Sequence, residues 1–246
     1  MRETLYGRHA VYESLRAGRR TFYRLLIADT VRATDVVSDI LTLAERAGVP
    51  VERVPRRHLD WMGEANHQGV ALEASEYPYV DLEDLLAQSI RRATPPFLLL
   101  LDLLQDPQNM GTLLRTAEAV GVDGVVIQQR RAVGITPAVV HTSAGAAEHL
   151  QIAQVSNLPE TIERLKDRDI WVIGLEAARG ALRYDQVDLT GPLALVVGSE
   201  GEGLRRLVQE RCDQMIQLPM VGKVSSLNAA VAGSVVLYEA WRQRAR

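Results

Sequence analysis

Three short segments after residue 100 combine polar side chains with glycines, a combination suited to binding a small ligand. The first spans residues 106–117, in which Asn109 is placed to cap a helix expected over 111–120 and Arg115 projects from that helix. A helix cap and a surface charge would explain these two residues equally well. On its own, this segment predicts structure more strongly than chemistry.

The second segment, residues 198–203, reads Gly-Ser-Glu-Gly-Glu-Gly between an expected strand and an expected helix. It departs from the G-x-G-x-x-G pattern of dinucleotide sites and lacks the lysine of a phosphate-binding P-loop. Glycines let a ligand approach the backbone closely, whereas the carboxylate of Glu200 would repel a phosphate. These features favour a sulfonium nucleoside over ATP or NAD, with a tight turn before a helix as the structural alternative.

The third segment, residues 218–228, reads Leu-Pro-Met-Val-Gly-Lys-Val-Ser-Ser-Leu-Asn before a C-terminal helix expected over 229–242. It brings Ser225, Ser226 and Asn228 together between a strand end and a helix start. A serine N-cap explains one serine but not the Pro-Met-x-Gly lead. Other catalytic patterns do not assemble. The chain has no G-x-S-x-G elbow, no zinc-protease histidine pair and no Cys/His cluster with metal-ligand spacing, so we expect no metal.

All three segments follow expected strands, which is where open α/β sheets bind their ligands. Residues 97–104 form a continuous apolar run, typical of a strand buried on both faces of a parallel sheet. The second part of the chain is therefore predicted to be an α/β domain with a mostly parallel sheet. Its further strands are expected at 124–127, 151–155, 170–174, 193–197 and 215–218.

The first 75 residues are expected to form a separate, small α/β module. Its predicted helices cover 10–18 and 34–47, its strands 23–28, 49–54 and 69–74, and a helical turn or two lies at 57–62. Proline-bounded segments then bracket a helix expected over 82–90. We therefore predict a first domain at 1–75, a linker at 76–96 and a second domain at 97–246.

The composition is that of an ordinary globular protein, with 47% hydrophobic and 24% charged residues among 246. No apolar run approaches the length of a membrane span, and the N-terminus lacks the apolar core of a signal peptide. The single cysteine, Cys212, cannot form an intrachain disulfide. We therefore expect a cytoplasmic protein without a membrane partner.

The net charge of −3 is unevenly distributed. Residues 1–75 carry 11 basic and 10 acidic side chains, against 17 and 21 in residues 76–246. Two arginine clusters in the first domain could attract a phosphate backbone, although a solvated helix face explains either cluster equally well. The clusters are Arg16, Arg19, Arg20 and Arg24, and Arg53, Arg56 and Arg57.

Taken together, the three segments resemble the motifs of the TrmH (SpoU) family of RNA ribose 2′-O-methyltransferases. In this sequence they read Asn-Met-Gly-Thr-Leu-Leu-Arg-Thr-Ala-Glu-Ala from residue 109, Val-Gly-Ser-Glu-Gly-Glu-Gly-Leu from residue 197, and the stretch 218–228. Two further stretches, Tyr6-Gly-Arg-His-Ala-Val11 and Asn66-His-Gln-Gly-Val70, resemble the RlmB branch, the 23S rRNA guanosine 2′-O-methyltransferases.

The resemblance implies a SPOUT-class catalytic domain with a C-terminal trefoil knot, preceded by a small RNA-binding domain that is similar to a ribosomal protein. It also implies a homodimer with its active site near the interface. S-adenosylmethionine would be the cofactor, bound by Gly198, Leu218 and Leu227, with Thr142, Ser143 and Gly145 lining the same pocket.

The catalytic group implied by the same motifs comprises Asn109, Arg115, Glu200, Ser226 and Asn228. Since a guanidinium stays protonated in proteins, we expect Arg115 to stabilise charge electrostatically rather than to act as a base. Ser226 and Asn228 would orient the hydroxyl and the loop. The sequence departs from the family pattern after Asn228, where it reads Ala-Ala-Val-Ala in place of Val-Ser-Val-Ala.

The resemblance predicts methyl transfer to a ribose 2′-hydroxyl of RNA, with a guanosine of 23S rRNA as the expected target. One alternative is a relative that acts on tRNA, which would more often lack a front module of this size. The other is a non-catalytic RNA-binding or ribosome assembly factor, against which the intact Asn109, Arg115, Glu200 and Asn228 count.

Overall fold

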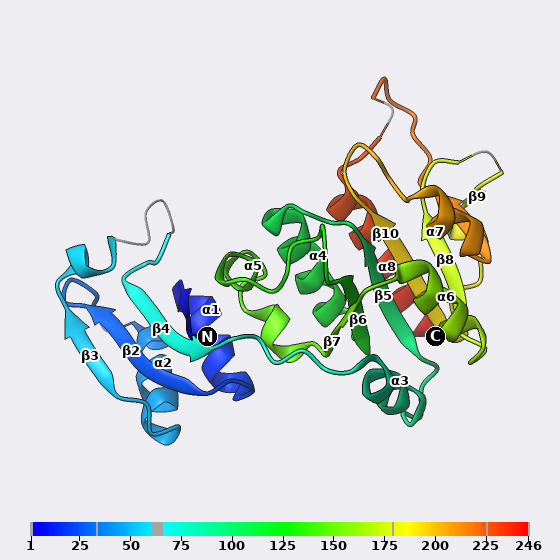
Figure 1. Cartoon of the computed structure of the whole chain (residues 1–246). Coiled ribbons are helices and arrows are strands. Elements are labelled where there is room, and N and C mark those ends of the chain that lie inside the picture. Colours follow the sequence, from blue (N-terminus) through cyan, green and yellow to red (C-terminus); the bar gives the residue numbers. More distant parts are fainter. Residues whose placement is uncertain (1, 33, 61–65, 179, 225, 246) are drawn as a thin grey trace. The chain divides into compact units, whose positions relative to one another are not determined.

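The structure is a computed structural model that describes residues 2–32, 34–60, 66–178, 180–224 and 226–245. The chain forms two compact units, traced in Figure 1. The first comprises Met1–Pro78 together with Ile135–His149, and the second comprises Tyr79–Gly134 together with Leu150–Arg246.

The first unit is built on a four-stranded mixed sheet with the order β1-β4-β2-β3. Only β2 and β3 run parallel, and β4 pairs antiparallel with both β1 and β2. Fully buried aliphatic side chains such as Leu25, Ile27 and Leu72 form its core. The elements of residues 1–78 are β1 (Arg2–Tyr6), α1 (Arg8–Ala17), β2 (Phe22–Ala28), α2 (Asp35–Arg46), β3 (Val51–Val54), η1 (Arg56–His58) and β4 (Val70–Ser75).

The helices and strands expected in this module are confirmed, with two differences. The strand β1 was not predicted. The turn expected at 57–62 is the short helix η1, Arg56–His58, and part of the predicted range lies outside the described residues. The helix α1 ends at Gly18, which adopts a left-handed conformation with φ 62° that glycine allows at no steric cost.

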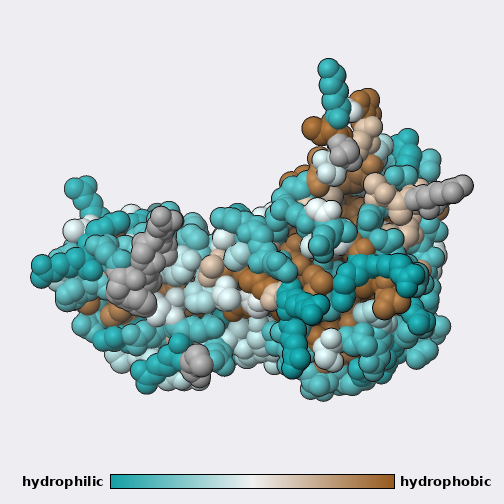
Figure 2. Space-filling model, turned by 45° about the horizontal axis from the view of Figure 1, so that its top comes forward, coloured by the Kyte–Doolittle hydropathy of each residue, from teal (hydrophilic) through white to brown (hydrophobic). Residues whose placement is uncertain are grey.

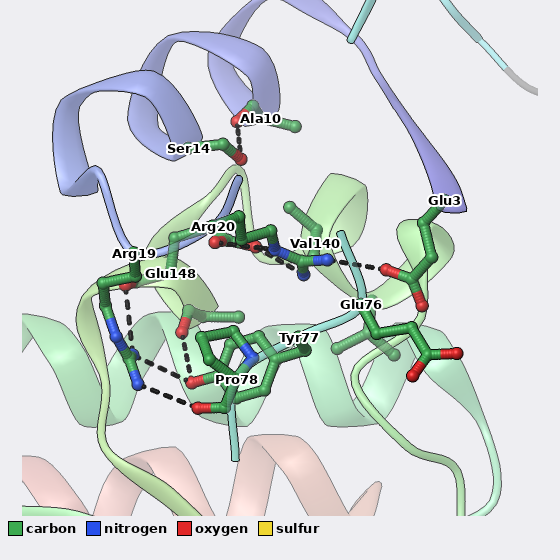
Figure 3. Close-up of polar contacts among 12 residues, drawn as sticks. Glu3, Ala10, Ser14, Arg19, Arg20, Glu76, Tyr77, Pro78, Val140 and Glu148 are labelled. Carbon is green, nitrogen blue, oxygen red and sulfur yellow. Dashed lines mark hydrogen bonds and ion pairs between the residues drawn. The ribbon is translucent and has the colours of Figure 1, made fainter. Parts of the chain in front are cut away.

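The segment Ile135–His149 joins the first unit although it lies far along the chain. It contains α5 (Pro137–Thr142) and η3 (Ala146–His149). Figure 3 shows the ion pair that joins this segment to the rest of the first unit. The buried Arg20 guanidinium donates to the buried Glu148 carboxylate at 2.7 Å and to Glu3 at 2.6 Å. The hydroxyl of Tyr77 donates to the backbone oxygen of Ala147 at 3.1 Å.

This arrangement differs from the predicted division into consecutive domains, which assigned residues 97–246 to one domain. One reason is electrostatic, since Arg20 and Glu148 are both shielded from water and each needs the other as its counter-charge. Another is packing, since α5 packs on β1 and η3 packs on α1. Neither residue stands in a pattern that would have indicated the pairing.

The second unit is built on a seven-stranded sheet with the order β7-β6-β5-β10-β8-β11-β9, in which every recorded pair is parallel. The predicted mostly parallel α/β fold is therefore confirmed. Its strands are β5 (Phe97–Asp102), β6 (Gly124–Gln128), β7 (Ile152–Val155), β8 (Trp171–Leu175), β9 (Leu182–Arg183), β10 (Leu193–Gly198) and β11 (Gln214–Gln217). Its helices are α3 (Leu82–Ile90), α4 (Pro107–Ala119), α6 (Leu158–Lys166), η4 (Tyr184–Gln186), α7 (Arg206–Arg211) and α8 (Ala229–Arg244).

Helices cover both faces of this sheet, which is why β5 is apolar at every position before Asp102. On one face, buried side chains of α3, α6 and α7 belong to the same core cluster as Leu98 and Leu100, alternate side chains of β5. On the other, α4 and α8 pack together, and Gly233 of α8 lies against Leu113 and Val197. The strand ends at Asp102, two residues earlier than expected, because Leu103 turns the chain with a φ of 56°.

The predicted linker, 76–96, is not a free connection in its second part. The helix α3 has the predicted bounds, and its Leu85 and Leu86 belong to the core of the second unit. At the other end of the chain, Arg244 of α8 donates to the backbone oxygens of Leu189 and Pro96. The order of these C-terminal elements is consistent with the expected trefoil knot, which stays a prediction.

Candidate active site

A pocket with a volume of about 470 Å³ opens in the second unit, at the carboxyl ends of β8, β10 and β11. Two loops from the predicted motifs form its walls, and Figure 1 shows them rising from the same edge of the sheet. This is the edge at which open parallel sheets bind ligands. The lining comprises Leu175, Glu176, Ala177, residues 197–203, Gln217, Leu218, Met220, Ser226, Leu227, Asn228, Ala229 and Ala232.

The loop after β10 folds back on itself and presents its backbone to the pocket. Ser199 and Gly203 bridge it with two backbone hydrogen bonds of 3.2 and 3.1 Å. A Cβ atom at Gly198 would lie 2.3 Å from the backbone carbon of Gly203, so no side chain fits there. The close return of this loop explains why the sequence needs glycine at position 198.

Glu176 holds this loop in place and was missed by the sequence reasoning. Its carboxylate accepts hydrogen bonds from the backbone N–H of Leu204 at 2.8 Å and from the amide of Gln209 at 3.0 Å. It also lines the pocket. In the sequence Glu176 is only an acid after a strand, and its role depends on β8 pairing with β10.

Three of the predicted catalytic residues form one hydrogen-bonded group. The side-chain amide of Asn228 donates to Oδ1 of Asn109 at 2.8 Å and to the Glu200 carboxylate. The carbonyl oxygen of the same side chain caps α8 by accepting from the backbone N–H of Val231 at 3.1 Å. Every hydrogen-bonding atom of the Asn228 amide is therefore used, which fixes its orientation.

Asn109 does not cap α4, contrary to the prediction. The helix begins at Pro107, and Asp106 is the N-cap, accepting from the backbone N–H of Asn109 at 3.0 Å. Proline favours the first helical position because it has no N–H to leave unsatisfied. The side chain of Asn109 lies in the first turn, buried, where it can accept from Asn228.

The other two predicted catalytic residues lie differently. Ser226 lines the pocket, while its neighbour Ser225 lies outside the described residues. Arg115 is exposed on α4 and is not part of the pocket lining. It lies six positions after Asn109 on the helix, so the two side chains are about 120° apart around the helix axis. No hydrogen bond or ion pair joins the Arg115 side chain to any other residue in the part of the chain that the structure describes.

The predicted cofactor residues divide into two groups. Gly198, Leu218 and Leu227 line the pocket. Thr142, Ser143 and Gly145 belong to the first unit and are not in this lining. There the buried Ser143 hydroxyl donates to the oxygen of Val140 at 3.0 Å. A Cβ on Gly145 would lie 2.5 Å from Cβ of Glu13, so this glycine allows close packing on α1.

The charge of the pocket suits a cation better than a phosphate. Glu176, Glu200 and Glu202 line it, and its described lining contains no lysine or arginine. Leu175, Leu218 and other aliphatic side chains supply an apolar wall for a planar base. Together with the cradle at Gly198, these features fit a positively charged nucleoside. Among the described residues, no three His, Cys, Asp or Glu side chains gather to hold a metal ion, and no helix is long and apolar enough to cross a membrane.

A parallel sheet with an acidic, nucleoside-sized pocket at its carboxyl edge defines an α/β enzyme that uses a nucleoside cofactor. Residues 96–238 match the SpoU rRNA methylase family, and residues 4–80 match the RNA 2′-O ribose methyltransferase substrate-binding domain. The chain belongs to the SpoU (TrmH) family of RNA 2′-O-methyltransferases, and S-adenosylmethionine is its cofactor.

Relatives of the whole chain have been described. YacO of Bacillus subtilis, a putative TrmH family tRNA/rRNA methyltransferase, is 45% identical over 240 residues, covering 97% of this chain and 94% of the relative. A protein of Staphylococcus aureus with the same description is 42% identical over 98% of this chain and 96% of the relative.

Solved structures resemble the chain to different extents. The SpoU methyltransferase AviRb of Streptomyces viridochromogenes, in complex with AdoMet, has a TM-score of 0.81 at 24% identity and covers 99% of this chain and 91% of that one. The TrmH/SpoU tRNA modifying enzyme of A. aeolicus has a TM-score of 0.56 at 26% identity and covers 66% of this chain and 83% of that one.

Proposed function

We propose that this enzyme methylates a guanosine ribose of 23S rRNA. The observation that carries the proposal is the first unit, since residues 4–80 match a substrate-binding domain for RNA 2′-O ribose methylation. The A. aeolicus tRNA modifying enzyme matches only 66% of this chain, whereas a solved rRNA methyltransferase of Sinorhizobium meliloti matches 98% of this chain and 87% of its own length. A front unit of this kind therefore favours rRNA over tRNA.

We propose that different residues of the pocket bind the cofactor and orient the ribose hydroxyl. S-adenosylmethionine supplies, when bound, a methyl group on a sulfonium centre. Gly198, Leu218 and Leu227 are proposed to hold it, largely through backbone groups and apolar contact. Asn228 fixes Glu200 and Asn109 relative to each other, so that the ribose hydroxyl meets a preorganised polar wall.

Arg115 is proposed to stabilise the developing negative charge of the ribose oxygen or a neighbouring phosphate. Within one chain it lies outside the pocket lining. Its neighbour Thr112, three residues earlier on α4, lines a groove of about 620 Å³ with Tyr238 and Trp241 of α8. We propose that a second copy of the chain covers this groove, which would bring Arg115 to the interface.

The proposal of a homodimer is supported by exposed apolar side chains of the second unit. Tyr238 and Trp241 of α8 are 51% and 46% exposed, and Val221 in the loop after β11 is 98% exposed. Figure 2 shows hydrophobic residues gathered over this projecting loop. Exposed apolar patches of this kind mark interaction surfaces.

Size-exclusion chromatography with light scattering tests this dimer. We expect Trp241→Glu to give a monomer, because the charge would be buried at the interface. Trp171→Glu is the matched control, since Trp171 is 45% exposed at the start of β8 and lies outside the groove. A wild-type chain that runs as a monomer at micromolar concentration would contradict the proposal.

The substrate proposal is tested by mapping 2′-O-methyl groups in RNA from a strain that lacks the gene. We expect one guanosine of 23S rRNA to lose its methyl group and to regain it when the purified enzyme and S-adenosylmethionine are added. Restoration only in tRNA would favour the tRNA alternative. The non-catalytic alternative predicts no binding of S-adenosylmethionine in calorimetry. The cytoplasmic location expected from the sequence stays a prediction.

A further inference from the structure

A second cavity, of about 640 Å³, lies entirely within the first unit. Its walls come from the start of α1, the loop between β2 and α2, the helix η1 and the turn before β4. Two stretches singled out in the sequence, 6–11 and 66–70, thus meet at one site. The polar residues of its lining are Arg8, His9, Thr30, Thr34, Arg56 and Gln68.

The two stretches are fastened together by hydrogen bonds. The backbone N–H of Arg8 donates to Oε1 of Gln68 at 3.0 Å, and Nε of Arg8 donates to the backbone oxygen of Gln68 at 3.3 Å. The turn also depends on Gly69, where a Cβ would lie 2.2 Å from Cγ2 of Val31. These contacts fix the shape of the cavity and hold the Arg8 side chain at its edge.

The two arginine clusters of the first unit differ in what their side chains contact. Those of the first sequence cluster are used inside the unit: Arg16 pairs with Glu13, Arg20 with Glu148, and Arg24 with Glu52 and Glu73, while Arg19 donates to Tyr77 and to backbone oxygens. This cluster is a structural feature.

The second cluster is different. Within the described residues, Arg53, Arg56 and Arg57 are exposed, and their side chains make no hydrogen bond or ion pair. The His9 side chain is likewise exposed and makes no hydrogen bond or ion pair within the described residues, and the Nη atoms of Arg8 have no partner among them. No carboxylate belongs to the described lining, and Asp29 and Asp35, at the ends of the β2–α2 loop, are exposed outside it. Among the described residues, no carboxylate neutralises the positive charge that lines this cavity.

We propose that this cavity binds one nucleotide of the substrate RNA. Arg8 and Arg56 contact a backbone phosphate, as arginine forks commonly do. The hydroxyls of Thr30 and Thr34 and the amide of Gln68 reach the ribose or a base edge, while His9 offers a ring on which an unpaired base can stack. The volume suits a ligand of this size. The inference rests on the proposed function, because it takes RNA as the substrate.

Binding of a fluorescein-labelled, single-stranded RNA oligonucleotide of mixed sequence to the full-length protein tests this site. We expect Arg8→Gln combined with Arg56→Gln to weaken binding by about tenfold or more at low salt, and to reduce the slope of log affinity against log salt by about 1.4, because each contact to a single-stranded phosphate contributes ~0.7. The matched control is Arg16→Gln combined with Arg24→Gln, which removes the same charge from exposed positions of the same unit. The control should stay within about twofold of wild type.

Further measurements keep the test decisive. Within the described residues, Arg56→Gln alone removes no side-chain hydrogen bond or ion pair, so we expect this variant to fold like wild type and to lose about threefold or more in RNA affinity. Both double variants should bind S-adenosylmethionine like wild type, and in methylation the KM for RNA should rise for the Arg8/Arg56 variant while kcat is retained. Equal RNA binding by the two double variants would overturn the proposal.

Competition by another polyanion tests whether the cavity is specific for RNA. Displacement of the RNA by polyglutamate at equal charge would show a surface for any polyanion or acidic protein, and would also overturn the nucleotide site. Failure of the proposed function looks different: the wild type would bind the oligonucleotide in an Arg8- and Arg56-dependent way but would methylate no 23S rRNA.

Discussion

Position 198 has no space for any side chain, because the loop after β10 returns over it. We therefore expect Gly198→Ala to lower the affinity for S-adenosylmethionine by more than about tenfold, since a Cβ 2.3 Å from the Gly203 backbone forces the loop away from the cofactor. Calorimetry measures this directly. Gly191→Ala is the control, because a Cβ at Gly191 meets nothing within 4 Å. Affinities of the two variants within twofold of each other would contradict this account of the loop.

Cys212 is predicted to be unreactive in the folded protein. Burial, followed by the negative charge of Asp213, raises the pKa of its thiol to about 12. At pH 8 only about one thiol in ten thousand is then ionised, and the thiolate is the reactive form. Alkylation by iodoacetamide should be slow at pH 8 and should become fast in a denaturant. Because the folded pKa is raised, this residue costs no stability near neutral pH and destabilises the fold only as pH rises above the value of 9.0 for a free thiol. Equal alkylation rates in both states would refute the assignment.

At this scale the sequence predicted the residues of the site better than their contacts. Gly198, Glu200, Leu218, Leu227 and Asn228 stand in recognisable motifs, and the structure brings them to one pocket. The contact between Asn109 and Asn228 was not predictable, since it joins two helix starts 119 positions apart. Glu176 was missed for a similar reason, because its partners come from a distant loop.

The residue that caps α8 has two roles, whereas the residue that caps α6 has one. Asn228 caps α8 and also orders Asn109 and Glu200, whereas Asn157 caps α6 by accepting from Glu160 and lies outside the pocket lining. We expect Asn228→Ala and Asn157→Ala to cost a similar free energy of unfolding, about 1 kcal/mol each. Only Asn228→Ala should also slow single-turnover methyl transfer, by about 10²-fold, because the polar wall of the pocket loses its order. Equal rates in the two variants would remove Asn228 from the site.

The elements of the second unit were predictable where local pattern decides them. The run 97–104 predicted a strand buried on both faces, and β5 is buried at all its positions. The two-residue strand β9 was not predicted from the sequence, because its pairing depends on the adjacent strand β11 rather than on its own residues. Likewise, the segment with α5 and η3 has no local feature that assigns it to one unit rather than the other.

The first unit depends on one buried ion pair. Arg20→Ala leaves the Glu148 carboxylate buried without its counter-charge, so we expect a loss of about 3–5 kcal/mol in the free energy of unfolding. Arg24→Ala removes two exposed pairs and should cost less than about 1 kcal/mol. Urea denaturation followed by circular dichroism compares the two. Similar losses would mean that the Arg20–Glu148 pair contributes no more than a surface contact.

The same segment has a consequence for synthesis of the protein. Domains generally fold as they emerge from the ribosome, the N-terminal one first. Here the N-terminal unit cannot be completed when Pro78 emerges, because Glu148 and its helices are still to be translated. Meanwhile β5 and β6 have been made, but β10, which flanks β5 in the finished sheet, comes later still. The nascent chain therefore carries two unfinished units at once, and a translational pause between residues 78 and 149 leaves both exposed to misfolding.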